Sequence, residues 1–244
     1  MVAPAPRATL QQALVQALLS RRIVPRAELV RLYTELCGAL EVPPDLDDDL
    51  AALQPRVAAV GLDVRTCHDP VSAAPFVVLT NAKADALAEL ATPHSPAELQ
   101  YIKALVDAVV HAPDYRFAVP STQALQMASQ MQPPMTKQAA NELLRSLEHR
   151  GWLVLSRRTG AYALSLRALV ELDTYLRNEM DGGVLECMVC YTIVTVGAVC
   201  RTHGCRGAVH TSCADAYRAG HTTCAQCAQP WDPRPVGEAA AGAD

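Results

Sequence analysis

The feature that most constrains this chain is a dense set of seven cysteines and one histidine between residues 187 and 227. In chain order they are Cys187, Cys190, Cys200, Cys205, His210, Cys213, Cys224 and Cys227. Zinc prefers thiolate and imidazole ligands and takes four of them, and a two-residue spacer lets one tight turn present two ligands to one ion. These ligands therefore predict two Zn²⁺ ions. The segment is rich in Ala, Gly and Thr, so we expect it to need metal in order to fold.

Spacing alone leaves open how the ligands are shared between the two ions. They form four pairs along the chain, at 187/190, 200/205, 210/213 and 224/227. The short gap between the second and third pairs permits sequential sites. A RING arrangement instead joins the first pair to the third and the second to the fourth. His203 competes with Cys200 or Cys205 as a ligand, whereas we expect His221 to be a surface residue.

Composition indicates a mostly helical protein of two or three domains. The chain has 244 residues, of which 50% are hydrophobic and 5% aromatic, and no apolar run approaches the length of a membrane span. We therefore expect no membrane contact. The arginines before Glu28 would also suit a mitochondrial transit peptide, but the repeat of Leu10, Leu14 and Leu18 favours a first helix. The odd number of cysteines, clustered at one end, argues against a disulfide framework.

Residues 8–92 are predicted to form a first winged-helix domain. Leucines at helical spacing indicate two helices, Asp45 can cap a third, and residues 62–67 and 75–80 have the pattern of a strand pair. Three helices followed by a β-hairpin is the winged-helix order. Residues 67–80 of this hairpin, with the apolar Val77, Val78 and Leu79, are a candidate edge for a partner protein.

Residues 95–181 repeat that order as a second winged-helix domain. A capping box at Ser95 opens its first helix, and residues 157–160 form the wing of its hairpin. A last helix is predicted over residues 166–180. It runs into a flexible joint at residues 181–183.

The predicted fold class is mainly α (α+β). Two tandem winged-helix domains are followed by a small RING-like, zinc-binding domain at residues 184–232. Residues 233–244 are predicted to be a disordered tail.

The second winged helix carries the candidate DNA-contacting residues. A winged helix often places its third helix in the major groove. Lys137 and Arg145 lie on that helix, and Arg157 and Arg158 lie on the wing. Because acidic residues share the helix and no segment is strongly basic, a protein-docking role competes with DNA binding.

The combination of these features resembles the non-SMC element one family, the RING-like subunits of the DNA-repair structural-maintenance-of-chromosomes (SMC five–six) complex. The likeness covers about residues 8–232 and includes the ending Cys224-x2-Cys227-x3-Trp231. The segments that carry it are LLSRRIVPRAELVRLY, PFVVLTNAKADALAEL, SPAELQYIKALVDAVV and RGWLVLSRRTGAYALSLRALVELDTYLRNEM.

The resemblance implies a nuclear, chromosome-associated subunit that acts in DNA damage repair and recombination. It implies a MAGE-fold partner, a kleisin partner and a ubiquitin ligase activity that depends on the MAGE partner. In such a ligase the RING, with its cross-brace zinc sites, holds a ubiquitin-conjugating enzyme and orients its thioester. No residue of this chain is then a catalytic nucleophile.

Three positions bear on that activity. Val189, between the first two ligands, is the apolar residue that a RING offers to the conjugating enzyme, although simple packing against the zinc loop is an equal alternative. Ala225 stands where proline commonly follows the seventh ligand. Ala228 stands near where a basic residue commonly clamps ubiquitin. We therefore expect weak autonomous ligase activity.

Three other functions stay open. The chain could be a non-catalytic, zinc-stabilised interaction subunit of the same complex. It could be a PHD-type histone-tail reader, which needs an aromatic cage or an acidic pocket, and the zinc segment offers only Tyr191, Tyr217 and Trp231. It could also be a winged-helix DNA-binding protein, with a salt-dependent affinity for duplex DNA.

Overall fold

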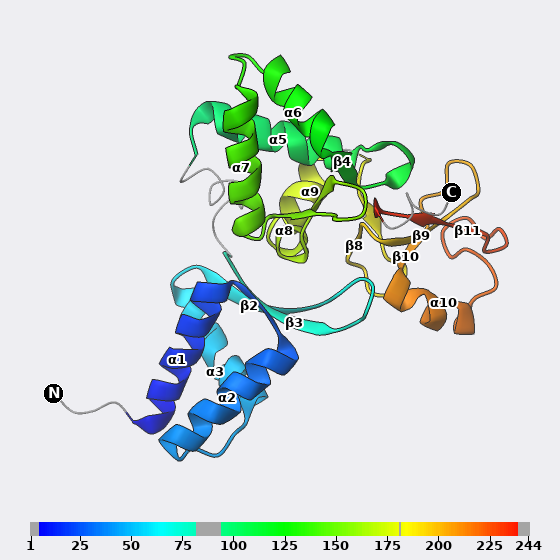
Figure 1. Ribbon diagram of the computed structural model, residues 1–244. Helices are drawn as coiled ribbons and strands as arrows, with labels where there is room; N and C mark the ends of the chain where they lie inside the picture. Colours follow the sequence, from blue (N-terminus) through cyan, green and yellow to red (C-terminus); the bar gives the residue numbers. More distant parts are fainter. Residues whose placement is uncertain (1–4, 82–93, 181, 239–244) are drawn as a thin grey trace. The chain divides into compact units, whose positions relative to one another are not determined.

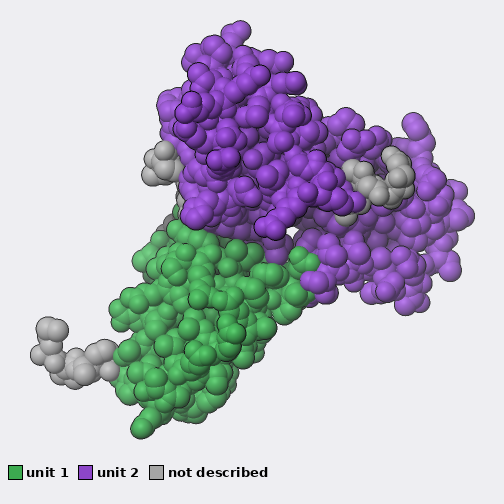
Figure 2. All heavy atoms as spheres, viewed as in Figure 1, with its two compact units in different colours: residues 1–69, 74–84 green, residues 70–73, 85–244 purple. Residues whose placement is uncertain are grey.

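The chain folds into two compact units, drawn in green and purple in Figure 2. The first comprises residues 1–69 and 74–84, and the second comprises residues 70–73 and 85–244. In this computed structural model the described residues are 5–81, 94–180 and 182–238. Within these ranges no helix combines the length and the apolar character needed to cross a membrane.

Over its described residues, the first unit consists of three helices and a three-stranded antiparallel sheet (Figure 1). The helices are α1 (Pro6–Arg21), α2 (Arg26–Leu40) and α3 (Leu46–Ala59), and the strands are β1 (Ile23–Pro25), β2 (Leu62–His68) and β3 (Pro75–Asn81). The sheet order is β1-β3-β2. Asp45 caps α3 as predicted, since its carboxylate accepts a 3.1 Å hydrogen bond from the N–H of Asp48.

The core of this unit lies between the helices and the central strand β3. Leu10, Leu14 and Leu18 of α1 are buried in it, which confirms the predicted first helix. Val77 and Leu79 belong to the same core. The prediction that residues 77–79 expose an apolar edge is therefore wrong, because β3 is paired on both sides and its inner face packs on the helices.

A buried carboxylate joins α1 and α2 to α3. Asp49 accepts hydrogen bonds from the Tyr33 hydroxyl at 2.5 Å, the Arg7 Nε at 3.1 Å and the Gln11 Nε2 at 3.0 Å. Burial by itself raises the pKa of a carboxyl, but these donors and the charge of Arg7 outweigh it. The pKa of Asp49 consequently lies below its ordinary value, so the group is ionised at neutral pH.

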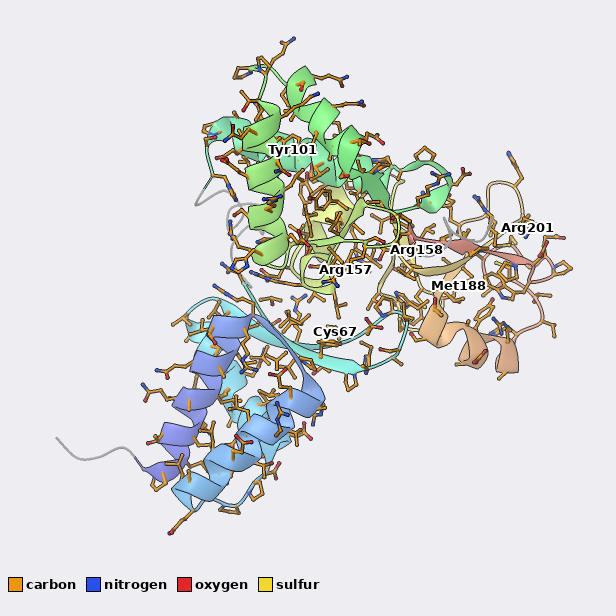
Figure 3. All side chains as sticks on the ribbon, in the orientation of Figure 1. Cys67, Tyr101, Arg157, Arg158, Met188 and Arg201 are labelled. Atoms are coloured by element: carbon orange, nitrogen blue, oxygen red, sulfur yellow. The ribbon has the colours of Figure 1, made fainter. Side chains whose placement is uncertain are left out.

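The second unit contains a helix–hairpin module, residues 94–180, in which the same order of elements recurs. Its helices and turn are α5 (Pro96–Val110), η1 (Pro113–Tyr115), α6 (Ser121–Gln130), α7 (Lys137–His149), α8 (Leu166–Glu171) and α9 (Asp173–Glu179). Its strands are β4 (Ala118–Pro120), β5 (Leu153–Leu155) and β6 (Ala161–Leu164), in the order β4-β6-β5. Tyr101 of α5 is buried in the core of this module (Figure 3).

The first helix and the last helix of this module can each be compared with a prediction from the sequence. The capping box is present, because Ser95 Oγ accepts from the N–H of Glu98 at 3.3 Å and the Glu98 carboxylate accepts from the N–H of Ser95 at 2.7 Å. The single last helix predicted over residues 166–180 is instead two helices. The chain turns at Leu172 (φ −91°, ψ 4°), and this lets both Leu172 and Leu176 be buried in the core.

Residues 182–238 of the second unit form the module that carries the Cys/His residues, which we call the zinc module. Its elements are β7 (Leu185–Glu186), β8 (Ile193–Val194), β9 (Gly197–Cys200), β10 (Ala208–His210), η2 (Thr211–Cys213), α10 (Ala214–Gly220) and β11 (Pro233–Val236). Strand β11 pairs with β9 in the order β10-β9-β11. The predicted disordered tail is therefore wrong for residues 233–236, since an edge strand tolerates their prolines. Residues 239–244 lie outside the described residues.

The two modules of the second unit share their hydrophobic cores. Phe117, from the helix–hairpin module, is buried in the core of the zinc module, and Ile193 of β8 belongs to the helical core. The joint between them is packed rather than flexible at Gly183, where an added Cβ would lie 2.5 Å from Val110 Cγ1. Asp181 lies outside the described residues. The second winged helix and the zinc domain were predicted as separate domains, but they form one unit.

We expect Asp49→Asn to destabilise the first unit by about 2–3 kcal/mol, because it weakens a charged and fully buried acceptor. Native-state hydrogen exchange across α1–α3 measures this loss. Since the folded pKa of Asp49 is depressed, its stabilisation is present above the unfolded pKa of about 3.9 and disappears as the pH falls through the folded value. The difference between the variant and the wild type should therefore shrink below about pH 4.

Asp48→Asn is the matched control. Asp48 is its neighbour, with a side chain 70% exposed that pairs with Arg7 at 3.2 Å. Such an exposed pair contributes at most about 1 kcal/mol. Equal losses from the two variants would show that the buried network does not stabilise the unit.

Candidate metal centre

Cys187, Cys190, His210 and Cys213 form the first of two Cys/His clusters. The first two ligands follow β7, His210 ends β10, and Cys213 ends η2. All four ligand atoms lie within 4.8 Å of one another. Nδ1 of His210 is 3.3 Å from Cys190 Sγ and 4.0 Å from Cys213 Sγ. The first and third ligand pairs thus meet, as a cross-brace requires.

Cys200, Cys205, Cys224 and Cys227 form the second cluster, again with all ligand atoms within 4.8 Å of one another. Sγ of Cys200 lies 3.8 Å from that of Cys227, and Sγ of Cys205 lies 3.7 Å from that of Cys224. The second and fourth pairs are therefore crossed, and the sequential alternative is wrong. Within the described residues, His203 belongs to neither cluster.

The distances fit tetrahedral zinc coordination. Sulfur atoms about 2.3 Å from a central ion lie about 3.8 Å apart in a tetrahedron, and an imidazole nitrogen lies about 3.6 Å from such a sulfur. The observed sulfur pairs are 3.7 and 3.8 Å apart, and the two nitrogen–sulfur distances, 3.3 and 4.0 Å, bracket the ideal value. A disulfide needs about 2.0 Å, and the cysteines are free thiols. Each cluster can hold one tetrahedral ion.

Crowding shifts the pKa values of these thiols in both directions. Burial, together with neighbouring cysteines, raises the pKa of Cys205 and of Cys213 to about 12. Burial also opposes ionisation of Cys187, but hydrogen bonds with His210 and with backbone N–H groups lower its pKa to about 6. A divalent cation supplies the positive charge that lets all the thiols of a cluster ionise together.

A hydrogen bond on the side of the ring away from the sulfurs fixes the orientation of His210. Its Nε2 lies 3.0 Å from the carbonyl oxygen of Ile193, which accepts the proton of that nitrogen. Nδ1 consequently faces the sulfurs and is the atom able to bind a metal ion. Burial disfavours the imidazolium, but the bonds to Cys187 and Ile193 raise the pKa of His210 to about 9. Protons therefore compete with metal for Nδ1, and the affinity of the site falls on acidification.

Two residues that support the clusters were missed from the sequence. The Tyr217 hydroxyl accepts from the N–H of Ala225 at 2.8 Å and donates to the carbonyl of Thr223 at 3.0 Å, which holds the loop of the fourth ligand pair. A Cβ on Gly207 would lie 2.6 Å from Cys224 Sγ, so only glycine fits there. A glycine two residues after a ligand was a usable signal, whereas a lone tyrosine in a short helix was not.

Val189 and Tyr191 give the first zinc loop an exposed apolar surface. Val189 is 38% exposed and Tyr191 is 69% exposed. Met188, which precedes them, is labelled in Figure 3 and packs partly into the core of the zinc module. Ala228 is also exposed, with a positive φ of 57°. His221 is exposed as expected, and its ring stacks on Tyr217 with centroids 4.7 Å apart.

The four basic residues predicted to contact DNA are all exposed, and they lie in the helix–hairpin module. Lys137 and Arg145 lie on α7, and Arg157 and Arg158 lie on the loop between β5 and β6. Figure 3 labels the two arginines. All eight predicted metal ligands thus lie in the two clusters, whereas the basic candidates belong to a different module.

A helical N-terminal portion followed by two interleaved Cys/His clusters defines a RING-like protein. A family model described as "Nse1 non-SMC component of SMC5-6 complex" matches residues 11–172, and one described as "RING-like domain" matches residues 187–227. The first match covers more than half of the chain. The chain therefore belongs to the Nse1 family of SMC5-6 complex components.

Individual relatives agree with this assignment. The chain is 28% identical over 151 residues to "Non-structural maintenance of chromosomes element 1" of Schizosaccharomyces pombe, and the match spans 62% of each protein. It is 25% identical over 226 residues to the homologue of Xenopus laevis, which covers 90% of this chain and 82% of that protein. A solved structure, described as "Nse1-Nse3-Nse4 complex", contains a chain with the same fold, at a TM-score of 0.80 and 22% identity, covering 95% of this chain and 98% of that one.

We expect two zinc ions per purified chain by elemental analysis, one for each cluster. Chelation should unfold the zinc module. Because that module shares its core with the helix–hairpin module, chelation should also destabilise residues 94–180 while sparing the first unit. Hydrogen exchange with and without chelator measures both effects.

Cys213→Ser should remove zinc from the first cluster, and His221→Ala is its control. His221 lies outside both clusters, so its loss should leave the zinc content at two per chain. One zinc ion per wild-type chain, or equal metal loss from the two variants, would contradict the ligand assignment.

Proposed function

We propose that the chain is the RING-like subunit of a nuclear, chromosome-associated complex of the SMC5-6 type that acts in DNA repair and recombination. Membership of the Nse1 family supports this role. The solved structure that contains the same fold is described as an Nse1-Nse3-Nse4 complex, which supports a MAGE-fold partner and a kleisin partner for this chain. We further propose that both clusters bind Zn²⁺ and so fix the shape of the zinc module.

We infer that this subunit is a ubiquitin ligase whose activity depends on the MAGE-fold partner. The observation that carries the proposal is the exposed Val189, held between two ligands of a cross-braced cluster. Such a surface suits a ubiquitin-conjugating enzyme. The contribution to the reaction is orientation of the thioester-linked ubiquitin, so the chain needs no nucleophile of its own.

The residue after the eighth ligand explains why a partner is needed. Ala228 is exposed but has no hydrogen-bond donor in its side chain. A donor to a polar or charged group is worth about 1–3 kcal/mol, or about tenfold to a hundredfold in rate. A bound partner is the simplest source of the missing restraint.

We also propose that the first unit, near residues 8–92, and the helix–hairpin module of the second unit, near residues 95–181, are winged helices, and that residues 184–232 are the RING-like part of the second unit. The second winged helix would make a weak DNA contact through the exposed side chains of Lys137, Arg145, Arg157 and Arg158. The exposed Glu142 and Glu148 share α7 with the first two and reduce its positive charge. For that reason we expect the contact to be weak and sensitive to salt.

A non-catalytic interaction subunit is the main alternative. Discharge of ubiquitin from a charged conjugating enzyme, with and without the MAGE-fold partner, separates the two. The histone-reader alternative has less support, because Tyr217 is buried and its ring contacts Trp231 with centroids 5.0 Å apart. These two rings pack on each other instead of lining an open cage.

Val189→Ala should lower partner-stimulated discharge about fivefold. The change removes apolar area worth about 1 kcal/mol from the surface offered to the conjugating enzyme. Val154→Ala is the control, because Val154 is an exposed valine of β5, outside the zinc module, at 52% exposure. A complex unaffected by Val189→Ala would exclude this residue from the enzyme contact.

Ala228→Arg should raise discharge by the chain without its partner about tenfold, since it supplies the absent charged donor. Ala228→Gln, which is long but neutral, should have a smaller effect. Strong activity of the wild-type chain alone would contradict the argument that a restraint is missing.

A further inference from the structure

The loop between β5 and β6 of the helix–hairpin module binds a carboxylate from the far end of the chain. We call this loop, residues 156–160, the wing loop. Oε1 of Glu238 accepts a 2.6 Å hydrogen bond from the hydroxyl of Ser156 and another of 2.6 Å from the hydroxyl of Thr159. The guanidinium of Arg158 lies 3.6 Å from the same oxygen and donates to the main-chain carbonyl of Glu238 at 2.8 Å.

Hydrogen bonds within the wing loop itself hold its donors in place. The N–H groups of Arg158 and Thr159 each donate to Ser156 Oγ at 3.3 Å. Since that oxygen already accepts two bonds, its own proton is directed outward, toward the bound carboxylate. Gly160 N–H donates to the Ser156 carbonyl at 2.9 Å and closes the turn. Two hydroxyls and one guanidinium thus converge on a single anionic oxygen.

The same donor set suits a phosphate oxygen of nucleic acid. Hydrogen bonds to DNA phosphates come mainly from Arg and Lys, from Ser and Thr hydroxyls and from backbone N–H groups. The carboxylate oxygen of Glu238 therefore stands in for a phosphate oxygen, since both are anionic acceptors. Burial raises the pKa of Glu238, but the two hydroxyls and Arg158 outweigh it and lower the pKa below its ordinary value. Glu238 is thus an anion at neutral pH.

Backbone contacts of the residues that precede Glu238 position it beside the wing loop. Strand β11 pairs with β9, and the N–H of Gly237 donates to the Tyr115 carbonyl at 2.8 Å. Figure 1 shows the hairpin of β5 and β6 reaching toward β11, and Figure 3 labels Arg157 and Arg158 there. The side chain of Arg158 is still 50% exposed, so a ligand in solution can reach it. An ion pair this accessible to water is weak and open to exchange.

We propose that the wing loop is a binding site for a backbone phosphate of duplex DNA and that Glu238 occupies it as an intramolecular competitor. The inference rests on the proposed DNA contact of the second winged helix, and it does not depend on the ligase activity. With Glu238 in place, its charge offsets one of the two arginines, Arg157 and Arg158. When Glu238 leaves, the loop gains a free anion site and one unit of net positive charge.

The test measures binding of the full chain to a short duplex DNA by fluorescence anisotropy over a range of salt concentrations. Glu238→Gln should tighten binding about threefold to tenfold at low salt. It should also steepen the slope of log K against log salt by about one unit, because one more phosphate contact is made. Asp215→Asn is the charge-matched control, since Asp215 pairs with Arg218 on the exposed face of α10.

Arg158→Gln in the Glu238→Gln background should restore the wild-type affinity and slope. The proposal is overturned if Glu238→Gln behaves like Asp215→Asn, if its gain survives Arg158→Gln, or if neither the wild type nor Glu238→Gln binds the duplex. A chain that binds DNA without responding to Glu238→Gln would leave the DNA contact standing and remove only the competition. None of these outcomes bears on the partner and ligase assays.

Hydrogen exchange of the wild-type chain tests the same proposal without any variant, so a poorly folded variant cannot decide the result. At saturating duplex, amide hydrogen exchange should slow at residues 156–160 and rise at residues 237–238, as the carboxylate is displaced. Unchanged exchange at residues 237–238 would contradict displacement.

Discussion

The interleaving of two four-ligand clusters is the constraint on which the zinc module depends. Its strands are two to four residues long, and its core contains few large side chains. Each cluster joins parts of the chain that lie on either side of a ligand pair of the other cluster. Neither site can then be completed without bringing the other close to its final geometry. We therefore expect metal binding and folding of this module to be one process.

That small core also explains the close association with the helix–hairpin module. Phe117 of the helix–hairpin module packs into the core of the zinc module, and Ile193 of the zinc module packs into the core of the helix–hairpin module. Strand β11 and Glu238 extend the association to the wing loop. A surface such as Val189 is thus held on a base that is larger than the zinc module alone. The proposed ligase function requires such a base, since a mobile one would not restrict the pose of a bound conjugating enzyme.

Local patterns in the sequence predicted most of this architecture. Ligand spacing identified all eight members of the two Cys/His clusters. The predicted caps at Asp45 and Ser95 were correct because a cap is decided within four residues. Long-range contacts were not predictable in this way. The pair Ser156 and Glu238 is 82 residues apart, and nothing in the sequence near either residue marks the other. The buried Asp49 was equally hidden, since an acidic residue in a first helical turn is expected to face solvent.

The pairing of ligands through the two metal ions is the central claim, and ¹¹³Cd-substituted protein tests it most directly. Scalar couplings between each cadmium and the cysteine Hβ protons identify the ligands of each ion. One cadmium should couple to Cys187, Cys190 and Cys213, and the other to Cys200, Cys205, Cys224 and Cys227, in keeping with the two clusters. Coupling of a single cadmium to Cys187, Cys190, Cys200 and Cys205 together would contradict the cross-brace and the account built on it.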